Sequence, residues 1–202
     1  MAVEVQSTGM LLIISGPSGT GKGTLVQKLM NDDPSFRFSC SVTTREPREG
    51  EIDGVHYYFV SKEEYHRLVA ENAFLEHAQV HNNFYGTLKK PVEEMMAQGL
   101  NVLLDIDTQG AINVMENASD YVSVFILPPS FTELENRLRG RNTDEPDVIE
   151  RRLRNAREEV KMLDRYQYAI VNDDLEQAYE RLKHIVNAEK LSTKRCKPAI
   201  TE

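Results

Sequence analysis

The sequence predicts an α/β fold in which helices cover both faces of a parallel β-sheet. Short apolar runs suited to buried strands, such as residues 10–14 and 102–104, alternate with segments that repeat apolar residues at helical spacing. A glycine-rich stretch at residues 16–24 lies between the first of these strands and a helix. Strand, glycine-rich turn and helix in that order make a phosphate-binding loop. We therefore expect a nucleotide at the carboxyl edge of the sheet.

The composition excludes several classes of protein. The chain has 202 residues and a formal net charge of −8, with 40% hydrophobic and 28% charged residues. These values are typical of one large globular domain, and the negative charge argues against general binding to nucleic acids. No apolar run approaches the roughly 20 residues of a membrane span, and the amino terminus lacks the basic region of a secretory signal. Two cysteines are too few for a disulfide framework, so we expect a cytoplasmic protein. We expect no nucleic-acid or membrane partner, and the oligomeric state, monomer or homodimer, stays open.

Local signals mark the elements of the amino-terminal half. Ser61 and Glu64 form a capping box, which predicts the start of a helix. Pro91 and Gly99 mark the two ends of the next helix. The elements expected in this half are a loose tail at 1–8, helices at 25–30, 61–71 and 91–99, and strands at 10–14, 36–42, 56–60 and 74–80.

In the carboxyl-terminal half, Pro128 and Pro129 close an apolar strand, and Pro146 begins a helix whose apolar residues keep a helical period. A polar run from Asn172 to Asp174 is suited to cap the last helix. The elements expected here are strands at 102–104, 121–127 and 168–171, and helices at 131–139, 146–163 and 175–191.

Two segments interrupt the regular alternation. Residues 44–97 are strand-rich and polar, like an insertion with a small sheet of its own. Residues 140–157 carry several arginines and are expected to form a helical hairpin. Both leave the chain near carboxyl ends of strands, so we expect them to close over a bound ligand. The remaining parts are a core at 9–43, 98–139 and 158–191, and tails at 1–8 and 192–202.

The glycine-rich stretch reads Gly-Pro-Ser-Gly-Thr-Gly-Lys-Gly-Thr. It matches the pattern G-x-x-x-x-G-K-[ST] except at Gly23, which replaces the usual hydroxyl residue and is followed by Thr24. Its backbone N–H groups would hold phosphates, and Lys22 would add a positive charge. The alternative is an ordinary glycine-rich turn. The residues expected to bind ATP here are Gly16, Pro17, Ser18, Gly19, Thr20, Gly21, Lys22, Gly23 and Thr24.

Further motifs include Ser-Val-Thr-Thr-Arg-Glu-Pro-Arg-Glu-Gly-Glu from residue 41, Gly-Val-His-Tyr-Tyr-Phe-Val from 54, Phe-Leu-Glu-His-Ala from 74, Asn-Phe-Tyr-Gly-Thr from 83 and Leu-Asp-Ile-Asp-Thr-Gln-Gly from 104. Together with the loop, with Arg-Leu-Arg-Gly-Arg-Asn-Thr from 137 and with Ile-Val-Asn-Asp-Asp from 170, this set resembles the guanylate kinase family over nearly all of residues 9–190. The resemblance implies a P-loop nucleoside monophosphate kinase core with a GMP-binding insertion and a helical lid. It also implies transfer of the γ-phosphoryl of MgATP to GMP or dGMP, in guanine nucleotide recycling.

The resemblance assigns roles to cationic residues. Arg45 and Arg48 would hold the GMP phosphate, together with hydroxyls of Tyr57 and Tyr85. Arginine suits this because its planar fork presents paired donors.

In the same way, Arg141 and Arg152 would reach the transferring phosphoryl from the lid, completing a catalytic group with Lys22 and Arg45. Arg137 and Asn172 would lie near ATP. Helical geometry places Arg152 at the border of its helix's apolar face, where it can point inward.

Guanine presents two donors, N1–H and the 2-amino group, and one carboxylate can accept from both. The resemblance implies that this carboxylate is Glu76, with Ser41, Thr87 and Asp107 completing the pocket. Adenine would leave it unpaired, because adenine lacks both donors. The alternative is that Glu76 is an ordinary carboxylate on an exposed strand.

Asp105 ends an apolar strand, where an acid can order the water around Mg²⁺. Thr24, or water, would replace the hydroxyl that Gly23 lacks. A simple strand-end cap is the alternative for Asp105. His77 and His81 lie on an expected strand and are interpreted as ordinary polar residues.

Two other functions remain open at this stage. One is a kinase for another monophosphate, such as AMP or UMP, against which Glu76 and Ser41 argue. The other is a binding module like the guanylate-kinase-like domains of membrane scaffolds, which use the GMP site for phosphopeptides. Those domains usually lose the phosphate loop, which is present here.

Overall fold

The computed structural model describes residues 5–140 and 145–198. Its centre is a parallel sheet with the strand order β10-β9-β2-β8-β3, which confirms the predicted α/β class. Within the described residues the strands of this sheet are β2 (Leu11–Ser15), β3 (Phe36–Phe38), β8 (Asn101–Asp105), β9 (Val122–Leu127) and β10 (Tyr168–Val171). All five residues of β2 are buried, as expected for the middle strand of a sheet covered on both faces.

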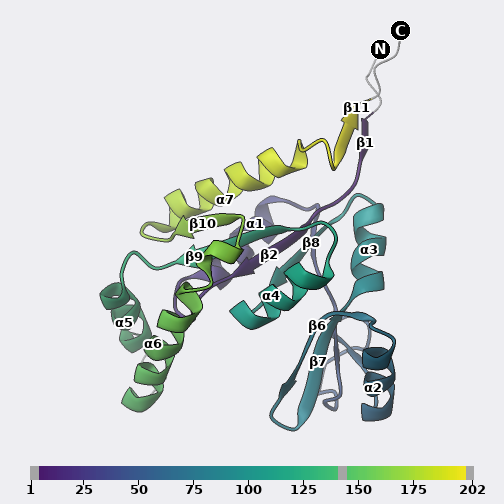
Figure 1. The fold of residues 1–202 in the computed structure, drawn as a ribbon, viewed down its shortest axis with the longest axis horizontal. Helices are drawn as coiled ribbons and strands as arrows, with labels where there is room; N and C mark the ends of the chain where they lie inside the picture. The colour runs from purple at the N-terminus through teal and green to yellow at the C-terminus, as the bar shows by residue number, and fades with distance from the viewer. Residues whose placement is uncertain (1–4, 141–144, 199–202) are drawn as a thin grey trace.

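Alternate side chains of β2 enter two separate hydrophobic cores. Leu12 and Ile14 pack with α1 (Lys22–Asp32) and α7 (Leu175–Lys190) on one face. Leu11 and Ile13 pack on the other face with α3 (Lys89–Ala97) and α4 (Thr108–Asn117). Figure 1 shows α7 and α4 on opposite sides of the sheet. The strand period of two residues therefore produces the three-layer core.

A second, smaller sheet extends away from the core. Its strand order is β5-β4-β7-β6, and only the β4–β5 pair is parallel. Val42, Tyr65 and Phe74 form its core beneath a single helix. The elements are β4 (Ser41–Thr43), β5 (Tyr57–Phe59), α2 (Lys62–Ala70), β6 (Phe74–Val80) and β7 (Asn83–Leu88). The hydroxyl of Ser61 accepts a hydrogen bond from the Glu64 N–H, so the helix starts where the capping box predicts.

Helices α5 (Phe131–Gly140) and α6 (Pro146–Val160) pack against each other at the opposite end of the molecule from the small sheet (Figure 1). Leu134, Leu138, Ile149 and Ala156 form a core between them. On α6, Arg152 is half-buried, whereas its neighbours Arg151 and Arg154 are exposed. This burial agrees with the helical geometry expected for Arg152. A short 3₁₀ helix, Leu163–Arg165, connects α6 to β10.

The chain ends, expected as a loose tail at 1–8 and a tail of undetermined order at 192–202, contain two paired strands. Strand β1 (Val5–Ser7) pairs antiparallel with β11 (Cys196–Pro198). Arg195 anchors this ribbon, because it is 3% exposed and forms ion pairs with Asp120 and Glu189 at 2.9 and 2.6 Å. Both strands are short and polar, so the local sequence of neither strand indicates that the two pair with each other.

Two expected segment boundaries also need correction. The strand expected at 36–42 is two strands: β3 joins the large sheet, whereas β4 joins the small one. The core segment expected at 9–43 therefore leaves the large sheet after Phe38. Helix α3 was expected inside the insertion at 44–97, but its Val92 is buried in the core beside Leu11. Within the described residues, no helix is long and apolar enough to cross a membrane.

Candidate active site

The glycine-rich loop connects β2 to α1 at the carboxyl edge of the large sheet. Three of its glycines have backbone angles that suit glycine alone, with φ of +134° at Gly16, +93° at Gly19 and +89° at Gly21. A Cβ at Gly16 would overlap the carbonyl oxygen of Ile126, and one at Gly21 would overlap the side-chain amide of Asn172. The loop is thus pressed against β9 and the end of β10, which fixes its shape.

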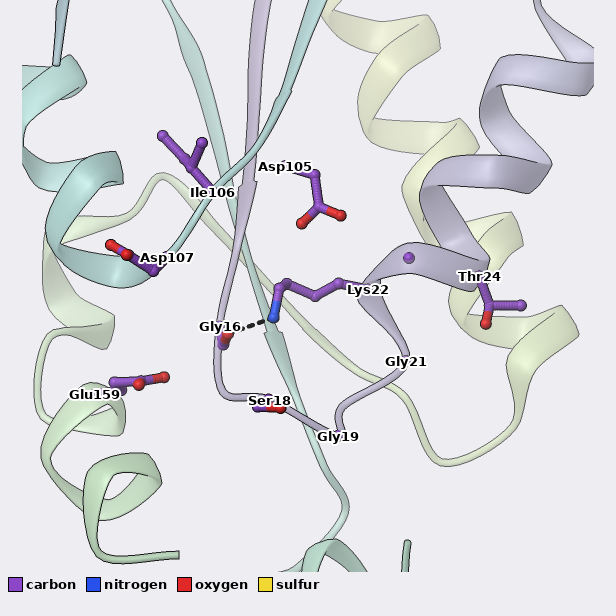
Figure 2. Close-up of a pocket in the computed structure, with 11 residues that line it drawn as sticks. Gly16, Ser18, Gly19, Gly21, Lys22, Thr24, Asp105, Ile106, Asp107 and Glu159 are labelled. Atoms are coloured by element: carbon purple, nitrogen blue, oxygen red, sulfur yellow. Dashed lines mark hydrogen bonds between the residues drawn. The ribbon is translucent and has the colours of Figure 1, made fainter. Parts of the chain in front are cut away.

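Lys22 begins α1 and folds back over this loop. Its Nζ donates hydrogen bonds to the carbonyl oxygens of Gly16 (2.5 Å) and Pro17 (3.2 Å), as Figure 2 shows for Gly16. The ammonium group therefore lies at the wall of the cleft rather than in open solvent. This arrangement places a positive charge beside the backbone N–H groups of the loop, as a phosphate site requires.

A cleft of about 600 Å³ opens over the loop. Side chains from three elements meet in it: the loop, the end of β8 and the end of α6 (Figure 2). Pro17 and Thr20 are buried behind the cleft, where the Thr20 hydroxyl donates to the Pro17 carbonyl at 2.9 Å. The lining residues are Gly16, Ser18, Gly19, Gly21, Lys22, Gly23, Thr24, Asp105, Ile106, Asp107 and Glu159.

Acidic groups face Lys22 across this cleft. Burial raises the pKa of the Asp105 carboxyl, and the positive charge of Lys22 opposes that shift. Burial likewise raises the pKa of Glu159. The positive charge of Lys22 opposes this shift, and the negative charge of Asp107 reinforces it. Carboxylate and hydroxyl oxygens from Asp105 and Thr24 in one cleft suit Mg²⁺. Within the described residues no group of three or more acidic, histidine or cysteine side chains could hold a metal.

A second cleft of about 440 Å³ lies between the small sheet and the start of α4. Ser41, Tyr57, Glu76 and Tyr85 line it, together with Ile106 and Asp107. Ile106 and Asp107 also line the first cleft, so the two clefts share a wall. Asp107 caps α4 by accepting a hydrogen bond from the Gly110 N–H at 2.7 Å. The junction between the clefts is therefore held in place by a helix terminus.

The carboxylate of Glu76 is half-buried in this second cleft. Burial raises its pKa, the negative charge of Asp107 reinforces the shift, and a hydrogen bond from Thr87 opposes it. The Thr87 hydroxyl donates to Glu76 at 2.7 Å, but Thr87 itself is buried behind the cleft. The Thr87 hydroxyl fixes the Glu76 carboxylate, whose remaining acceptor positions are suited to hydrogen bonds from a ligand.

Arg45 lies beside the second cleft, with its guanidinium over the Tyr57 ring at 5.5 Å. The Tyr57 and Tyr85 rings contact each other with centroids 6.2 Å apart. Arg45 also forms a two-bonded ion pair with Glu51. Arg48 is exposed, and its backbone N–H donates to the same carboxylate at 2.7 Å. The two arginines expected to bind phosphate are thus joined by Glu51.

The sequence is similar to that of known proteins over nearly its whole length. Residues 8–189 match the sequence model of a family described as guanylate kinase. The chain belongs to the guanylate kinase family. A guanylate kinase of Carboxydothermus hydrogenoformans is 50% identical over 187 residues, covering 93% of this chain and 92% of the relative. One from Neisseria meningitidis serogroup A is 51% identical over 187 residues, covering 93% and 91%.

The fold is also similar to that of a solved guanylate kinase from Anaplasma phagocytophilum. That structure is 38% identical in sequence, has a TM-score of 0.69, and the match covers 96% of this chain and 92% of that one. The family resemblance expected from the motifs is therefore confirmed, and so is the fold class.

Two residues expected near ATP, Arg137 and Asn172, do not line the loop cleft as far as the structure describes it. Arg137 instead donates to Glu133 at 2.8 Å and to the Asn172 carbonyl at 3.1 Å. Asn172 is 5% exposed and donates to the Thr20 carbonyl at 2.8 Å. Its side chain therefore supports the loop from behind. As far as the structure describes the cleft lining, Arg152 is not part of it. Arg141 lies outside the described residues.

Sequence reasoning missed Glu51 and Glu159, which both contact the site. Glu159 lies seven residues, about two helical turns, after Arg152 on α6 and therefore on the same border of the helix. That spacing was the available signal. Glu51 ends the motif that carries Arg45 and Arg48, but no spacing rule indicates that it pairs with Arg45. His77 contacts the Tyr65 hydroxyl at 3.1 Å, in agreement with an ordinary polar role.

Proposed function

We propose that this chain transfers the γ-phosphoryl of MgATP to GMP or dGMP, giving ADP and GDP or dGDP. One observation carries the proposal: the loop cleft and the Glu76 cleft share Ile106 and Asp107 as a common wall. Two nucleotides bound in these clefts would meet with their phosphates at that wall. The reaction belongs to the cytoplasm, where we expect the enzyme to act.

The chemistry requires positive charge more than it requires a base. The phosphate of a nucleoside monophosphate has a second pKa near 6, so its oxygens are already nucleophilic at neutral pH. One of these oxygens bonds to the γ-phosphorus while the bond to the β–γ bridging oxygen breaks, and ADP leaves. Catalysis then consists of aligning two polyanions and stabilising the charge on the transferring group. We assign this role to Lys22, Arg45, Arg141 and Arg152.

Two residues of the loop cleft would hold the metal. Asp105, through water, and Thr24 offer the oxygen ligands, and Mg²⁺ supplies charge neutralisation between the phosphates when it is bound. Position 23 has open space around it, since a Cβ there would meet nothing within 4 Å. Water can therefore occupy the place of the hydroxyl that Gly23 lacks.

Base selection is assigned to Glu76. Its two oxygens can accept from N1–H and from the 2-amino group of guanine, while Thr87 holds the carboxylate in position. Ser41 and Asp107 line the same cleft. Adenine would leave this half-buried carboxylate without donors, a mismatch that costs about 10⁴-fold in selectivity.

We further propose that closure brings the lid to the reaction. The small sheet with α2 and residues 140–157 are the mobile parts in this proposal, and the large sheet with its packed helices, α3 included, is the fixed core. Closure would carry Arg141 and Arg152 to the transferring phosphoryl and exclude water.

A coupled assay with ATP as donor and AMP, CMP, GMP, UMP or dGMP as acceptor tests the function. We expect kcat/KM for GMP to exceed that for AMP by about 10⁴-fold, with dGMP also accepted. Preferred turnover of AMP or UMP would overturn the proposal. Binding of GMP without turnover of any acceptor would favour a binding module instead.

A further inference from the structure

Glu51 holds both arginines of the phosphate site at once. Its carboxylate accepts two hydrogen bonds from the Arg45 guanidinium, at 3.0 Å from Nη1 and 2.9 Å from Nη2. The same carboxylate accepts from the backbone N–H of Arg48 at 2.7 Å. The Glu51 N–H returns a hydrogen bond to the Arg48 carbonyl at 3.0 Å. The loop between β4 and β5 is therefore closed by Glu51 around the two arginines.

The bonds to Glu51 use only one edge of the Arg45 guanidinium. Both hydrogens of Nη1 are taken, one by Glu51 and one by the Glu46 carbonyl at 2.7 Å, and Nη2 gives one hydrogen to Glu51. A guanidinium has five N–H donors, so Nε and the second Nη2 hydrogen remain on the adjacent edge. Among the described residues no second carboxylate pairs with Arg45, and the Tyr85 hydroxyl lies beside it. Two parallel donors on one edge match a phosphate.

The pair is also rigid and permanently charged. The Arg45 and Glu51 side chains are only 15% and 18% exposed, and the guanidinium lies over the rings of Tyr57 and Phe59 at 5.5 and 5.9 Å. The hydrogen bonds from Arg45 and from the Arg48 backbone lower the pKa of Glu51 to about 2. Glu51 is therefore ionised at every pH at which the enzyme would be assayed.

We propose that Glu51 is a positioning residue for the acceptor phosphate: it fixes Arg45 by one edge and leaves the other edge aimed at the ligand. This inference rests on the proposed function, because it takes GMP as the ligand. Simple electrostatics predicts the opposite sign, since removal of a negative charge near a phosphate site should strengthen anion binding. Positioning predicts weaker binding, because the free arginine must then be ordered when GMP binds.

The test compares Glu51→Gln with Glu49→Gln, an exposed acid two residues away in the same loop. Both variants lose one negative charge. We expect Glu51→Gln to raise Kd and KM for GMP about tenfold, with KM for ATP unchanged and kcat within about threefold. Glu49→Gln should bind GMP as wild type does or slightly more tightly. Glu51→Asp keeps the charge with a shorter reach, and should restore part of the affinity.

GMP binding is measured by calorimetry, separately from turnover. Wild-type enzyme that binds GMP but does not phosphorylate it would overturn the proposed function and leave the Glu51 comparison intact. Wild type that turns over GMP, beside Glu51→Gln with unchanged or tighter Kd, would overturn the role of Glu51 alone. A variant that binds GMP weakly counts as folded if its KM for ATP and its melting temperature equal those of wild type. If Glu51→Gln does not fold, Glu51→Asp takes its place. Equal GMP affinity in Glu51→Asp and wild type would then overturn the inference.

Discussion

The hydroxyl of Thr87 donates a 2.7 Å hydrogen bond to Glu76, and the two residues are direct partners across β7 and β6. Thr87 is 1% exposed, whereas Glu76 lines the second cleft. The bond engages Oε1, while Oε2 lies near Gly110 in the first turn of α4. One strand pair thus sets the orientation of the carboxylate before any ligand is present.

Glu76→Gln should weaken GMP binding specifically. The amide keeps one acceptor but turns an NH₂ group toward the donors of guanine, so a charged hydrogen bond is replaced by a clash of donors. We expect KM for GMP to rise about 100-fold, with KM for ATP within about threefold. Steady-state kinetics with each substrate varied in turn measures both. Glu93→Gln, an exposed acid on α3, is the matched control. Equal losses for both nucleotides would remove Glu76 from the base pocket.

The raised pKa of Glu76 has a consequence for the stability of the free enzyme. A carboxyl whose pKa is higher in the folded state holds more protons folded than unfolded, so the free energy of unfolding falls as pH rises through that window. The window begins near the ordinary value of 4.5 and ends at the raised pKa. Glu76→Gln lacks this loss, because glutamine does not titrate. Calorimetric melting of the apo enzyme at pH 5 and pH 7 measures the free energy of unfolding of both proteins. The stability of Glu76→Gln relative to wild type should increase from pH 5 to pH 7, and an equal stability difference at both pH values would contradict this.

Lys22→Ala should separate the two nucleotide sites. Lys22 lies in the loop cleft and bonds to the Gly16 and Pro17 carbonyls, away from the Glu76 cleft. We expect kcat to fall about 10²- to 10³-fold, because the charge beside the transferring phosphoryl is lost. The Kd for GMP should stay unchanged. Lys28→Ala, which removes a lysine of the same helix that pairs with Glu176, serves as control. Normal turnover by Lys22→Ala would show that the loop is not the ATP site.

The parts of the site that the sequence predicts are those encoded locally. Leu12 and Ile14 on one face of β2, with Leu11 and Ile13 on the other, form a continuous apolar run, which is the pattern of a buried parallel strand. The loop follows immediately, so its place at the sheet edge needs no long-range information. The family motifs then add the second cleft by resemblance.

The parts that the sequence does not predict depend on contacts between distant residues. Ser7 pairs with Cys196 across nearly the whole chain, and no local pattern specifies that partner. The sequence does not show that β3 and β4 are separate strands, because apolar and polar residues alternate through residues 36–42 although the chain passes there from the large sheet to the small one. Glu159 reaches the loop cleft only through the packing of α6. Each of these is decided by tertiary structure.

Asn172→Ala should destabilise the glycine-rich loop, because it removes the hydrogen bond that supports the loop on the side away from the cleft. The Asn172 amide is buried and donates to the Thr20 carbonyl at 2.8 Å, so alanine leaves that carbonyl unsatisfied next to Gly21. We expect a loss of about 1–2 kcal/mol in the free energy of unfolding, a melting temperature lower by about 3–6 °C, and a raised KM for ATP. Thermal melting and ATP kinetics check both effects. Asn187→Ala, an exposed position on α7, should change neither. If ATP affinity were kept despite lower stability, Asn172 would not shape the ATP site.

Arg152→Ala tests whether the lid must move. Arg152 is half-buried on α6 and is absent from the described lining of the loop cleft, so a role in transfer requires the part of α6 that carries Arg152 to approach the loop. We expect kcat to fall about 10²- to 10³-fold with both KM values within a few fold, because the arginine acts mainly on the transition state. Arg154→Ala, an exposed arginine on the same helix, should behave as wild type. Small-angle scattering of wild type with GMP and a non-hydrolysable ATP analogue should show a smaller radius of gyration than the free enzyme. An unchanged radius with both nucleotides bound, or normal kcat in Arg152→Ala, would contradict closure by the lid.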